Sequence, residues 1–370
     1  MSGPNVTLAS RTRRQRASAG SPVLVVGAIA LLLASIGGAA LLSLPDSATT
    51  AEPREPLDGV PSESDYVGYL DADTYRADGD AETATRRALR FQSLVQFYDG
   101  PRFRESFAIR ESSLDSDAVR EVTYFGRHNS SYHGRIVVGN WTARGLASAV
   151  EADANVTLEP TDVNGTTLHR GGGLAVARLG NDSNSTVLAV GNETAVRDAL
   201  AVTDGGGEGV AGPLRDEFEE REGYVRFAYR FQPFRVPNYP FVGEAVDSVE
   251  YVSSEYVLTR SSGNATAETD DRASNATVGV TIDITTTDSE SARSVRTILN
   301  AGVTFYRVES ANETLRDELG KVELPEADGR SVRLSYESSP RMLRVLIRGL
   351  FRNQPEPSGR LVGTGSEVAP

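Results

Sequence analysis

Residues 134–152 read GRIVVGNWTARGLASAVEA, and the plan of this stretch decides the fold. Its first part is a short run rich in isoleucine and valine, which favours a β-strand because β-branched side chains pack well on a pleated surface. After Asn140, apolar residues recur at the spacing of an amphipathic helix, with Thr142 near its start. Residues 187–202, VLAVGNETAVRDALAV, again place a helix after a strand. Such units predict an α+β fold.

Two hairpins indicate that the sheet is antiparallel. Asn164-Gly165 lies between two alternating stretches, and Asn-Gly is the strongest short hairpin signal. A second hairpin is predicted across residues 181–184, NDSN, between the strands LAVARLG and STVLAVGN. Antiparallel sheets of this kind commonly bury one face and expose the other.

A Gly-rich linker, residues 204–213, separates two stretches of similar plan. After it come the strands YVRFAYRF, SVEYVSSEYVLTR and ATVGVTIDIT and the helix SESARSVRTILNAGVTFY, in the order of the first stretch. We therefore predict two related α+β halves, residues 65–203 and 214–352, each with an antiparallel sheet and helices on one face. Residues 353–370 are predicted as a disordered tail.

The N-terminal part carries a candidate membrane anchor. Residues 22–44 contain no charged side chain and would span roughly 34 Å as a helix, enough for a hydrocarbon core of about 30 Å. The Arg-rich tail, residues 1–21, places the N-terminus in the cytoplasm and the bulk of the chain outside the cell. A Pro-rich stalk is predicted at residues 45–64. The alternative is a cleaved secretory signal, which also exports residues 46–370.

The composition limits the partners. The chain of 370 residues has a net charge of -13 and no cysteine, and Lys321 is the only lysine among its 38 basic residues. An acidic body argues against binding of nucleic acid. The absence of cysteine excludes disulfides and thiolate metal sites. The acidic, lysine-poor composition resembles that of proteins from halophilic archaea, in which molar salt shortens the Debye length to about 3 Å.

The pattern Asn-x-Ser/Thr occurs ten times after the apolar run, far above chance expectation. This pattern is the acceptor for N-linked glycans on exported surfaces. The alternative is that Asn, Ser and Thr recur together in turns and helix caps, which explains some of the sites. We predict glycans on several of these asparagines: Asn129, Asn140, Asn155, Asn164, Asn181, Asn184, Asn192, Asn264, Asn275 and Asn312.

No motif in the sequence indicates catalysis. His128 and His133 lie five residues apart, which allows a metal site. The favoured interpretation is that both are exposed histidines in a turn. The acidic stretch 71–82 lacks the glycine and the ligand spacing of a calcium loop. The Gly-x-Gly-x-x-Gly at residues 207–212 follows a predicted helix, so a linker is favoured over a dinucleotide site. We therefore predict no enzyme activity, no catalytic residue, no metal and no cofactor.

The last predicted helix, within SSPRMLRVLIRGLFRNQ, combines arginines with apolar residues. Its arginines recur every three or four residues, so they share one helix face: Arg341, Arg344, Arg348 and Arg352. Such a helix can lie on a lipid surface or dock on a partner. The other interpretation is a final helix that packs on its own sheet.

The lines GRIVVGNWTARGLASAVEA and VLAVGNETAVRDALAV resemble uncharacterised, exported, membrane-anchored envelope proteins of bacteria and archaea, in particular of halophilic archaea. The resemblance extends over roughly residues 60–350, includes no diagnostic motif, and implies an envelope protein without transferring any site. We expect a single-pass, N-glycosylated extracytoplasmic protein with a non-catalytic binding or envelope-structural role. Its expected partners are the bilayer, through residues 22–44, and an envelope protein or glycan. The alternatives are an envelope polysaccharide or peptide hydrolase and an assembly partner that uses the C-terminal arginine helix.

Overall fold

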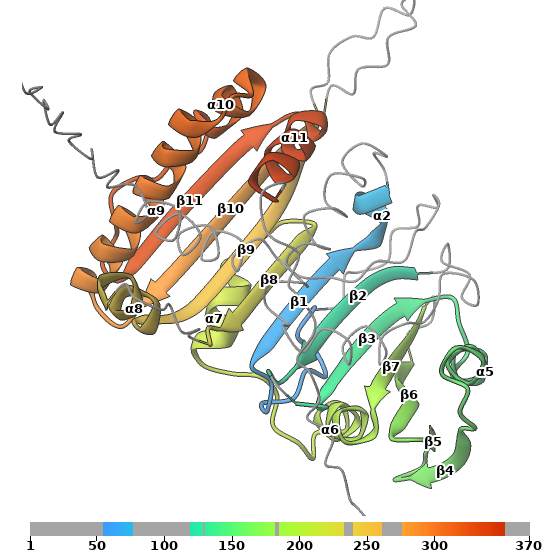
Figure 1. Cartoon of the computed structure of the whole chain (residues 1–370). Helices are drawn as coiled ribbons and strands as arrows, with labels where there is room; N and C mark the ends of the chain where they lie inside the picture. Colours follow the sequence, from blue (N-terminus) through green and yellow to red (C-terminus); the bar gives the residue numbers. More distant parts are fainter. Residues whose placement is uncertain are drawn as a thin grey trace, which may run out of the picture.

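The computed structural model describes residues 55–76, 119–128, 130–181, 185–232, 240–260 and 276–351. Within them, eleven strands form one sheet in the order β11-β10-β9-β8-β1-β2-β3-β7-β6-β5-β4 (Figure 1). The strands are β1 (Tyr66–Asp71), β2 (Val119–Gly126), β3 (His133–Gly139), β4 (Glu159–Val163), β5 (Thr166–Gly171), β6 (Leu174–Asn181), β7 (Thr186–Asn192), β8 (Val225–Arg230), β9 (Val249–Arg260), β10 (Ala276–Thr286) and β11 (Ser331–Ser338). All pairings are antiparallel, so the expected α+β class with an antiparallel sheet is confirmed.

The two predicted halves share this sheet, which corrects the expectation of a separate sheet in each. The seam is the pairing of β1 with β8, where Tyr66 faces Tyr229 and Leu70 faces Val225. Outward from the seam, the strands follow the chain as β1, β2, β3 and β7 on one side and as β8, β9, β10 and β11 on the other. An edge strand left at the end of either half would be an aggregation site, and pairing the two edges removes both.

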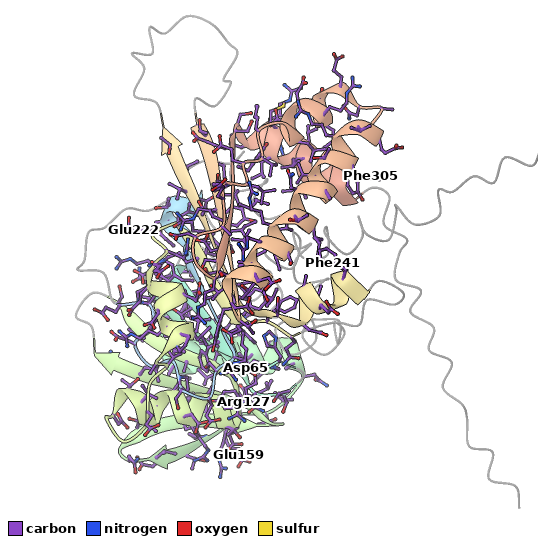
Figure 2. The ribbon with its side chains drawn as sticks, turned by 90° about the vertical axis from the view of Figure 1, so that its left-hand side faces the viewer. Asp65, Arg127, Glu159, Glu222, Phe241 and Phe305 are labelled. Atoms are coloured by element: carbon purple, nitrogen blue, oxygen red, sulfur yellow. The ribbon has the colours of Figure 1, made fainter. Side chains whose placement is uncertain are left out.

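Helices cover both faces of the sheet, although the sequence predicts helices on one face. The first face carries α5 (Ala143–Ala154), α8 (Pro240–Asp247), α9 (Ser289–Glu309), α10 (Glu313–Leu319) and α11 (Pro340–Phe351), whose buried residues form one cluster with the strands. The second face carries α6 (Glu193–Thr203) and α7 (Pro213–Glu219). A short helix, α2 (Ala72–Arg76), follows β1. Figure 2 shows Phe241 and Phe305 on one side of the sheet and Glu222 on the other.

Strand β3 shows why two layers of helices are needed. Successive side chains of a strand point to opposite faces. Val137 belongs to the cluster of the first face, while Ile136 and Val138 belong to that of the second, and all three are at most 5% exposed. A continuous apolar run therefore buries both sides of the strand, and each side requires its own cover.

The residues predicted as the end of the stalk pack on the second face instead. Leu57 and Val60 are 6% and 0% exposed, which places them in the core. This segment also pairs with the predicted Gly-rich linker, since Ser62 N–H donates to Glu208 O at 2.9 Å and Val210 N–H donates to Val60 O at 2.8 Å. Residues 55–64 are thus part of the fold, and the predicted linker 204–213 is held against them by backbone hydrogen bonds.

Local signals in the sequence placed many elements correctly. Asn164 and Gly165 have φ values of 53° and 83° and form the turn between β4 and β5. Thr142 caps α5, because its hydroxyl oxygen accepts a hydrogen bond from Gly145 N–H at 3.0 Å. The short helices α2, α8 and α10 were not predicted from the sequence.

Several predictions fall outside the described residues: the tail 1–21, the transmembrane helix 22–44, the stalk residues 45–54 and the tail 353–370. Among the residues that the structure describes, no helix combines the length and apolar character needed to cross a bilayer.

Candidate binding pocket

The outer part of the second face, over β9, β10 and β11, presents polar side chains. Strand β10 alternates here: Ile282 and Ile284 point into the core of the first face, whereas Asp283 and Thr285 point to the second face. The buried residues of α8 to α11 all belong to the first face, so α7 is the described helix that borders this surface. Val257 on β9 remains 41% exposed. An antiparallel sheet tolerates such a face in contact with water.

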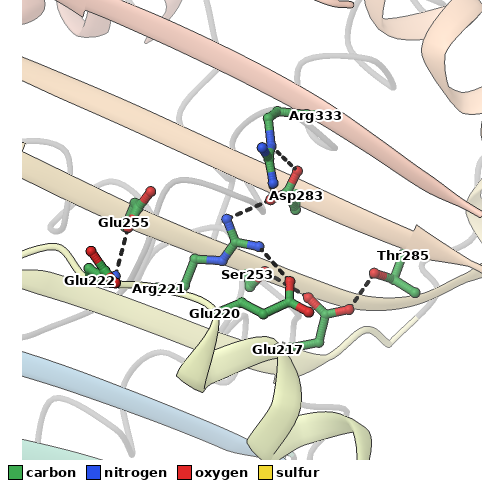
Figure 3. A network of polar contacts seen from close by, with 9 residues as sticks. All are labelled: Glu217, Glu220, Arg221, Glu222, Ser253, Glu255, Asp283, Thr285 and Arg333. Atoms are coloured by element: carbon green, nitrogen blue, oxygen red, sulfur yellow. Dashed lines mark hydrogen bonds and ion pairs between the residues drawn. The ribbon is translucent and has the colours of Figure 1, made fainter. Parts of the chain in front are cut away.

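Asp283 is the centre of a network of ion pairs (Figure 3). Arg333, on the neighbouring strand β11, donates from Nε to Oδ1 and from Nη2 to Oδ2, both at 2.9 Å. Arg221, just after α7, contacts Oδ2 through Nη1 from the other side. The two arginines differ in exposure, since the Arg221 side chain is 3% exposed and that of Arg333 is 57% exposed. Hydrogen bonding to Asp283 raises the pKa of the Arg333 guanidinium.

Glu217 forms a second polar group beside this network. Its carboxylate accepts a hydrogen bond from Ser253 Oγ at 2.8 Å and another from Thr285 Oγ1. These hydroxyls come from β9 and β10, so Glu217 ties α7 to two strands. Figure 3 shows Glu217 and Glu220 on the same side of α7 as Arg221, as expected for residues three and four apart on a helix.

The start of α7 explains this placement. Gly212, with a φ of 64°, turns the chain, and Pro213 occupies the first helical position, where its missing N–H costs nothing. Leu214 and Phe218 are then buried at 6% and 1% exposure against the sheet. Because these two residues fix the rotation of the helix, the Glu217 side chain reaches the hydroxyls of Ser253 and Thr285.

These groups line a cavity of about 530 Å³. Its wall on one side is α7, and on the other it is the loop between α10 and β11. The lining residues are Pro213, Asp216, Glu217, Glu220, Arg221, Asp283, Thr285, Pro325, Glu326, Asp328, Arg330, Ser331 and Arg333. Each of the three arginines already forms an ion pair with a carboxylate of the chain. Arg221 and Arg333 contact Asp283, and Arg330 contacts Glu250. The lining also offers carboxylate acceptors that take no part in these ion pairs, on Asp216, Glu326 and Asp328.

The geometry does not suit acid–base or nucleophilic catalysis by the groups at the floor. Both oxygens of Asp283 accept hydrogen bonds from guanidinium groups, so neither is placed to exchange a proton with a ligand. The hydroxyls bound to Glu217 belong to Ser253 and Thr285, which are 0% and 3% exposed. A nucleophile must reach the reacting atom, and these side chains are enclosed.

Five of the ten predicted glycan acceptors have side chains that the structure describes. Asn140, Asn155, Asn164 and Asn312 are exposed, and Asn192 is half-buried. The alternative explanation by turns and caps applies to four of them. Asn155 ends α5 with a φ of 52°, Asn164 lies in the turn after β4, and the side chains of Asn192 and Asn312 cap α6 and α10. Both roles are compatible where the cap uses the amide oxygen, because the glycan bonds to the amide nitrogen.

Four of the other predicted acceptors lie outside the described residues: Asn129, Asn184, Asn264 and Asn275. For the fifth, Asn181, the structure describes the backbone alone.

The C-terminal arginine helix is α11, and it packs on its own protein. Leu343, Leu346 and Ile347 are 3%, 6% and 3% exposed in the core of the first face. Arg341 and Arg348 are exposed, Arg344 is half-buried, and Arg352 lies outside the described residues. The apolar side that a lipid contact would need is therefore used inside the fold. Contact of the arginine side with a membrane or a partner stays a prediction.

The two neighbouring histidines have different partners. His128 Nε2 donates to Arg230 O at 2.9 Å, and its ring contacts those of Tyr66 and Tyr229, with centroids at 5.6 Å and 6.0 Å. His133 lies on β3 with 7% exposure, close to Arg135. In the described part of the chain, no group of three or more His, Asp or Glu side chains has the arrangement of a metal site.

His133 is expected to make the fold sensitive to acid. Burial, with a smaller effect of Arg135, lowers the pKa of His133 to about 4. A histidine in an unfolded chain has a pKa of about 6.5. Between the two pKa values, the unfolded chain therefore binds a proton at His133 and the folded chain does not. The stability present above pH 6.5 is therefore lost as the pH falls toward 4, by about 2–3 kcal/mol from this residue. Urea unfolding at pH 7 and pH 4.5 should show a smaller acid loss for His133→Gln than for the wild type. An equal loss in both proteins would contradict this assignment.

None of the residues that line the pocket was predicted from the sequence as a site residue. Asp283 stands in the alternating stretch TIDIT, where an acid at a polar position reads as solvent-facing. Its partners Arg221 and Arg333 are far away in the chain. The available signal was a single acid within an otherwise uncharged strand, and that signal is weak.

Comparisons with known proteins give distant matches. No protein-family model matches the chain, and no curated protein matches it. Among solved structures, crystal form I of TP0453 matches with a TM-score of 0.39 and 11% identity, covering 81% of this chain and 98% of TP0453. Crystal form III of TP0453 matches with a TM-score of 0.41 and 9% identity, covering 80% and 99%. These values mark a remote likeness, from which no property of TP0453 is transferred to this chain.

Proposed function

We propose that this protein is a non-catalytic binding protein of the cell envelope, held to the membrane by residues 22–44 and folded outside the cell. We propose further that its pocket between α7 and the loop before β11 binds a hydroxyl-rich envelope glycan. The observation that carries the binding role is the polar cavity of about 530 Å³ over the Arg221–Asp283–Arg333 network.

The chemistry of the lining favours a ligand that donates hydrogen bonds. The guanidinium groups are engaged with Asp283, Glu220 and Glu250, while rim carboxylates keep free acceptor oxygens. Sugar hydroxyls donate to such oxygens, and hydrogen bonds to charged groups contribute about 1.5–3 kcal/mol each. A purely ionic ligand would be held weakly in molar salt, where charges are screened beyond about 3 Å.

The position of the pocket supports an envelope ligand. Glu55 lies near the start of the folded part and forms an ion pair with Arg215 of α7, at 3.8 Å. The next residue of α7, Asp216, lines the pocket. Residues 45–54 can span at most roughly 35 Å. The pocket would therefore stay close to the membrane from which the chain emerges.

The plan of the fold supports the interpretation that residues 65–203 and 214–352 are related halves. The same chain order outward from the seam between β1 and β8 is the supporting observation. Among the residues that the structure describes, α6 covers the second face of the first half, whereas no helix covers the corresponding face of the second half at β10 and β11. A binding surface on one half alone is the result of this difference.

Binding of neutral oligosaccharides to the detergent-solubilised full-length protein tests the proposal. We expect Glu326→Gln combined with Asp328→Asn to weaken binding at least tenfold, because two charged acceptors are lost. The matched control is Glu323→Gln, a nearby exposed carboxylate outside the pocket, which should bind like the wild type. Affinity should change little between low and molar salt. If spermidine binds instead, with an affinity that falls steeply with salt, recognition is ionic and the glycan proposal is wrong.

A further inference from the structure

The two edge strands of the sheet, β11 and β4, differ in whether another segment pairs with their outer side. At the β11 edge, Glu323 and Ser335 exchange backbone hydrogen bonds of 2.9 Å and 3.0 Å, and Asp328 and Ser331 exchange bonds of 3.0 Å and 2.9 Å. The loop before β11 therefore occupies this edge. A bare edge would offer unpaired N–H and C=O groups to another chain.

The β4 edge has no such cover among the described residues. β4 pairs with β5 on one side, from Glu159 opposite Arg170 to Val163 opposite Thr166, and ends the strand order on the other. Its residues are exposed or half-buried. Pro160 and Asp162 weaken the edge as a template, but the backbone remains accessible over a length of about 17 Å.

A predicted glycan acceptor stands on each side of β4 in the sequence. Asn155 ends α5, four residues before β4 begins, and Asn164 lies in the turn directly after β4. Both side chains are exposed, and both asparagines have a positive φ, which directs the backbone out of the regular elements. Apart from Gly165 and its two chain neighbours, no described residue comes within 4 Å of the position that a Cβ on Gly165 would take, so the turn has open space around it.

Asn192 provides the contrast. Its Oδ1 accepts from Thr194 N–H at 3.1 Å, and its Nδ2 donates to Gly173 O at 3.4 Å. The amide nitrogen that a glycan would need is therefore in use, and the side chain is half-buried. The same tripeptide pattern thus occurs in an environment that admits a sugar and in one that does not.

We propose that N-linked oligosaccharides on Asn155 and Asn164 flank β4 and prevent a second copy of this chain from pairing with that edge. This inference rests on the proposed location outside the cell. Asn140 and Asn312 are equally exposed and also take glycans, but they lie away from β4, whereas Asn192 stays bare. The sugar occupies the space beside the β4 edge. Its bulk hinders strand pairing there, as Pro160 also does by lacking a backbone N–H.

The experiment uses the full-length protein from a cell that N-glycosylates its envelope proteins. Because Asn155 and Asn164 have φ values of 52° and 53°, replacing them would strain the backbone. The sequons are removed through their third residues instead, by Thr157→Val and Thr166→Val. The matched control removes two distant sequons, by Asn140→Gln and Thr314→Val. Peptide masses report which sites are occupied, and sedimentation in detergent reports the oligomeric state.

We expect sugar on Asn140, Asn155, Asn164 and Asn312, none on Asn192, and a monomeric wild type. The Thr157→Val/Thr166→Val protein should self-associate with rising concentration, while the control variant remains monomeric. A monomeric Thr157→Val/Thr166→Val protein, or bare Asn155 and Asn164 beside a modified Asn140, would overturn the role at the edge and leave the location outside the cell intact. If Asn140 is also bare, the proposed location fails, and this inference fails with it.

Discussion

Asp283→Asn should lower the free energy of unfolding by about 3–5 kcal/mol, the usual effect of removing one partner from a buried ion pair. The reason is the position of Arg221, whose side chain is 3% exposed and contacts Asp283. Asparagine has a similar shape but no charge, so the enclosed guanidinium would lose its buried counter-ion and keep only the exposed carboxylate of Glu220. The loss should persist in molar salt, because buried pairs are screened much less than surface pairs. Urea unfolding at constant salt measures it.

Glu220→Gln is the matched control for this change. Glu220 also contacts Arg221, at 3.3 Å, but its side chain is 68% exposed. Exposed pairs contribute about 0–1 kcal/mol, so this variant should unfold nearly like the wild type. A second comparison replaces both members, by Arg221→Met with Asp283→Leu. Because apolar residues can substitute for a buried ion pair, this double variant should recover most of the stability. Equal stability of Asp283→Asn and Glu220→Gln would contradict the assigned role of Asp283.

The elements that the sequence predicted well are set by contacts close in the chain. The hairpin at Asn164 needs only two residues that accept a positive φ, and α5 needs a cap at Thr142 and an apolar stripe. These requirements are visible within a dozen residues. The same locality explains why α6 was placed correctly from residues 193–202.

The arrangement of the halves could not be predicted in this way. The pairing of Tyr66 with Tyr229 at the seam joins distant parts of the chain, and no local pattern selects it over two separate sheets. The helices on both faces were within reach of the sequence, however. Ile136, Val137 and Val138 form an unbroken apolar run, which is typical of a strand buried on two sides. The prediction of helices on one face gave too little weight to that run.

The pocket was unpredictable for a different reason. Its floor joins Arg221, Asp283 and Arg333, which come from three separate elements. A buried and an exposed carboxylate look alike in a sequence with 51 acidic residues. Only the fold shows that Asp283 is 4% exposed and lies between two guanidinium groups. Exported location and glycans, by contrast, were predictions from composition and motif, and they stay predictions.

Phe125→Ala should destabilise the protein by about 3–5 kcal/mol, through the cavity that it opens beside the seam. Phe125 lies on β2, is 0% exposed, and belongs to the cluster of the second face with Val60 and Val67. It is paired directly with Gly134 of β3. A Cβ on Gly134 would come within 2.4 Å of the Phe125 ring, so the ring occupies the space that the glycine leaves free. This ring therefore packs β2 against β3 within the cluster of the second face.

Phe241→Ala is the matched control, because Phe241 on α8 is 53% exposed and its truncation leaves no closed cavity. It should cost less than about 1 kcal/mol. The converse change, Gly134→Ala, pushes a methyl group into the Phe125 ring and should cost about 1–3 kcal/mol by overpacking. In the Phe125→Ala background that methyl group has room, so the two changes together should cost less than the sum of the single changes. Additive losses in urea unfolding would show that Phe125 and Gly134 do not share this space, and the packing described between β2 and β3 would then be wrong.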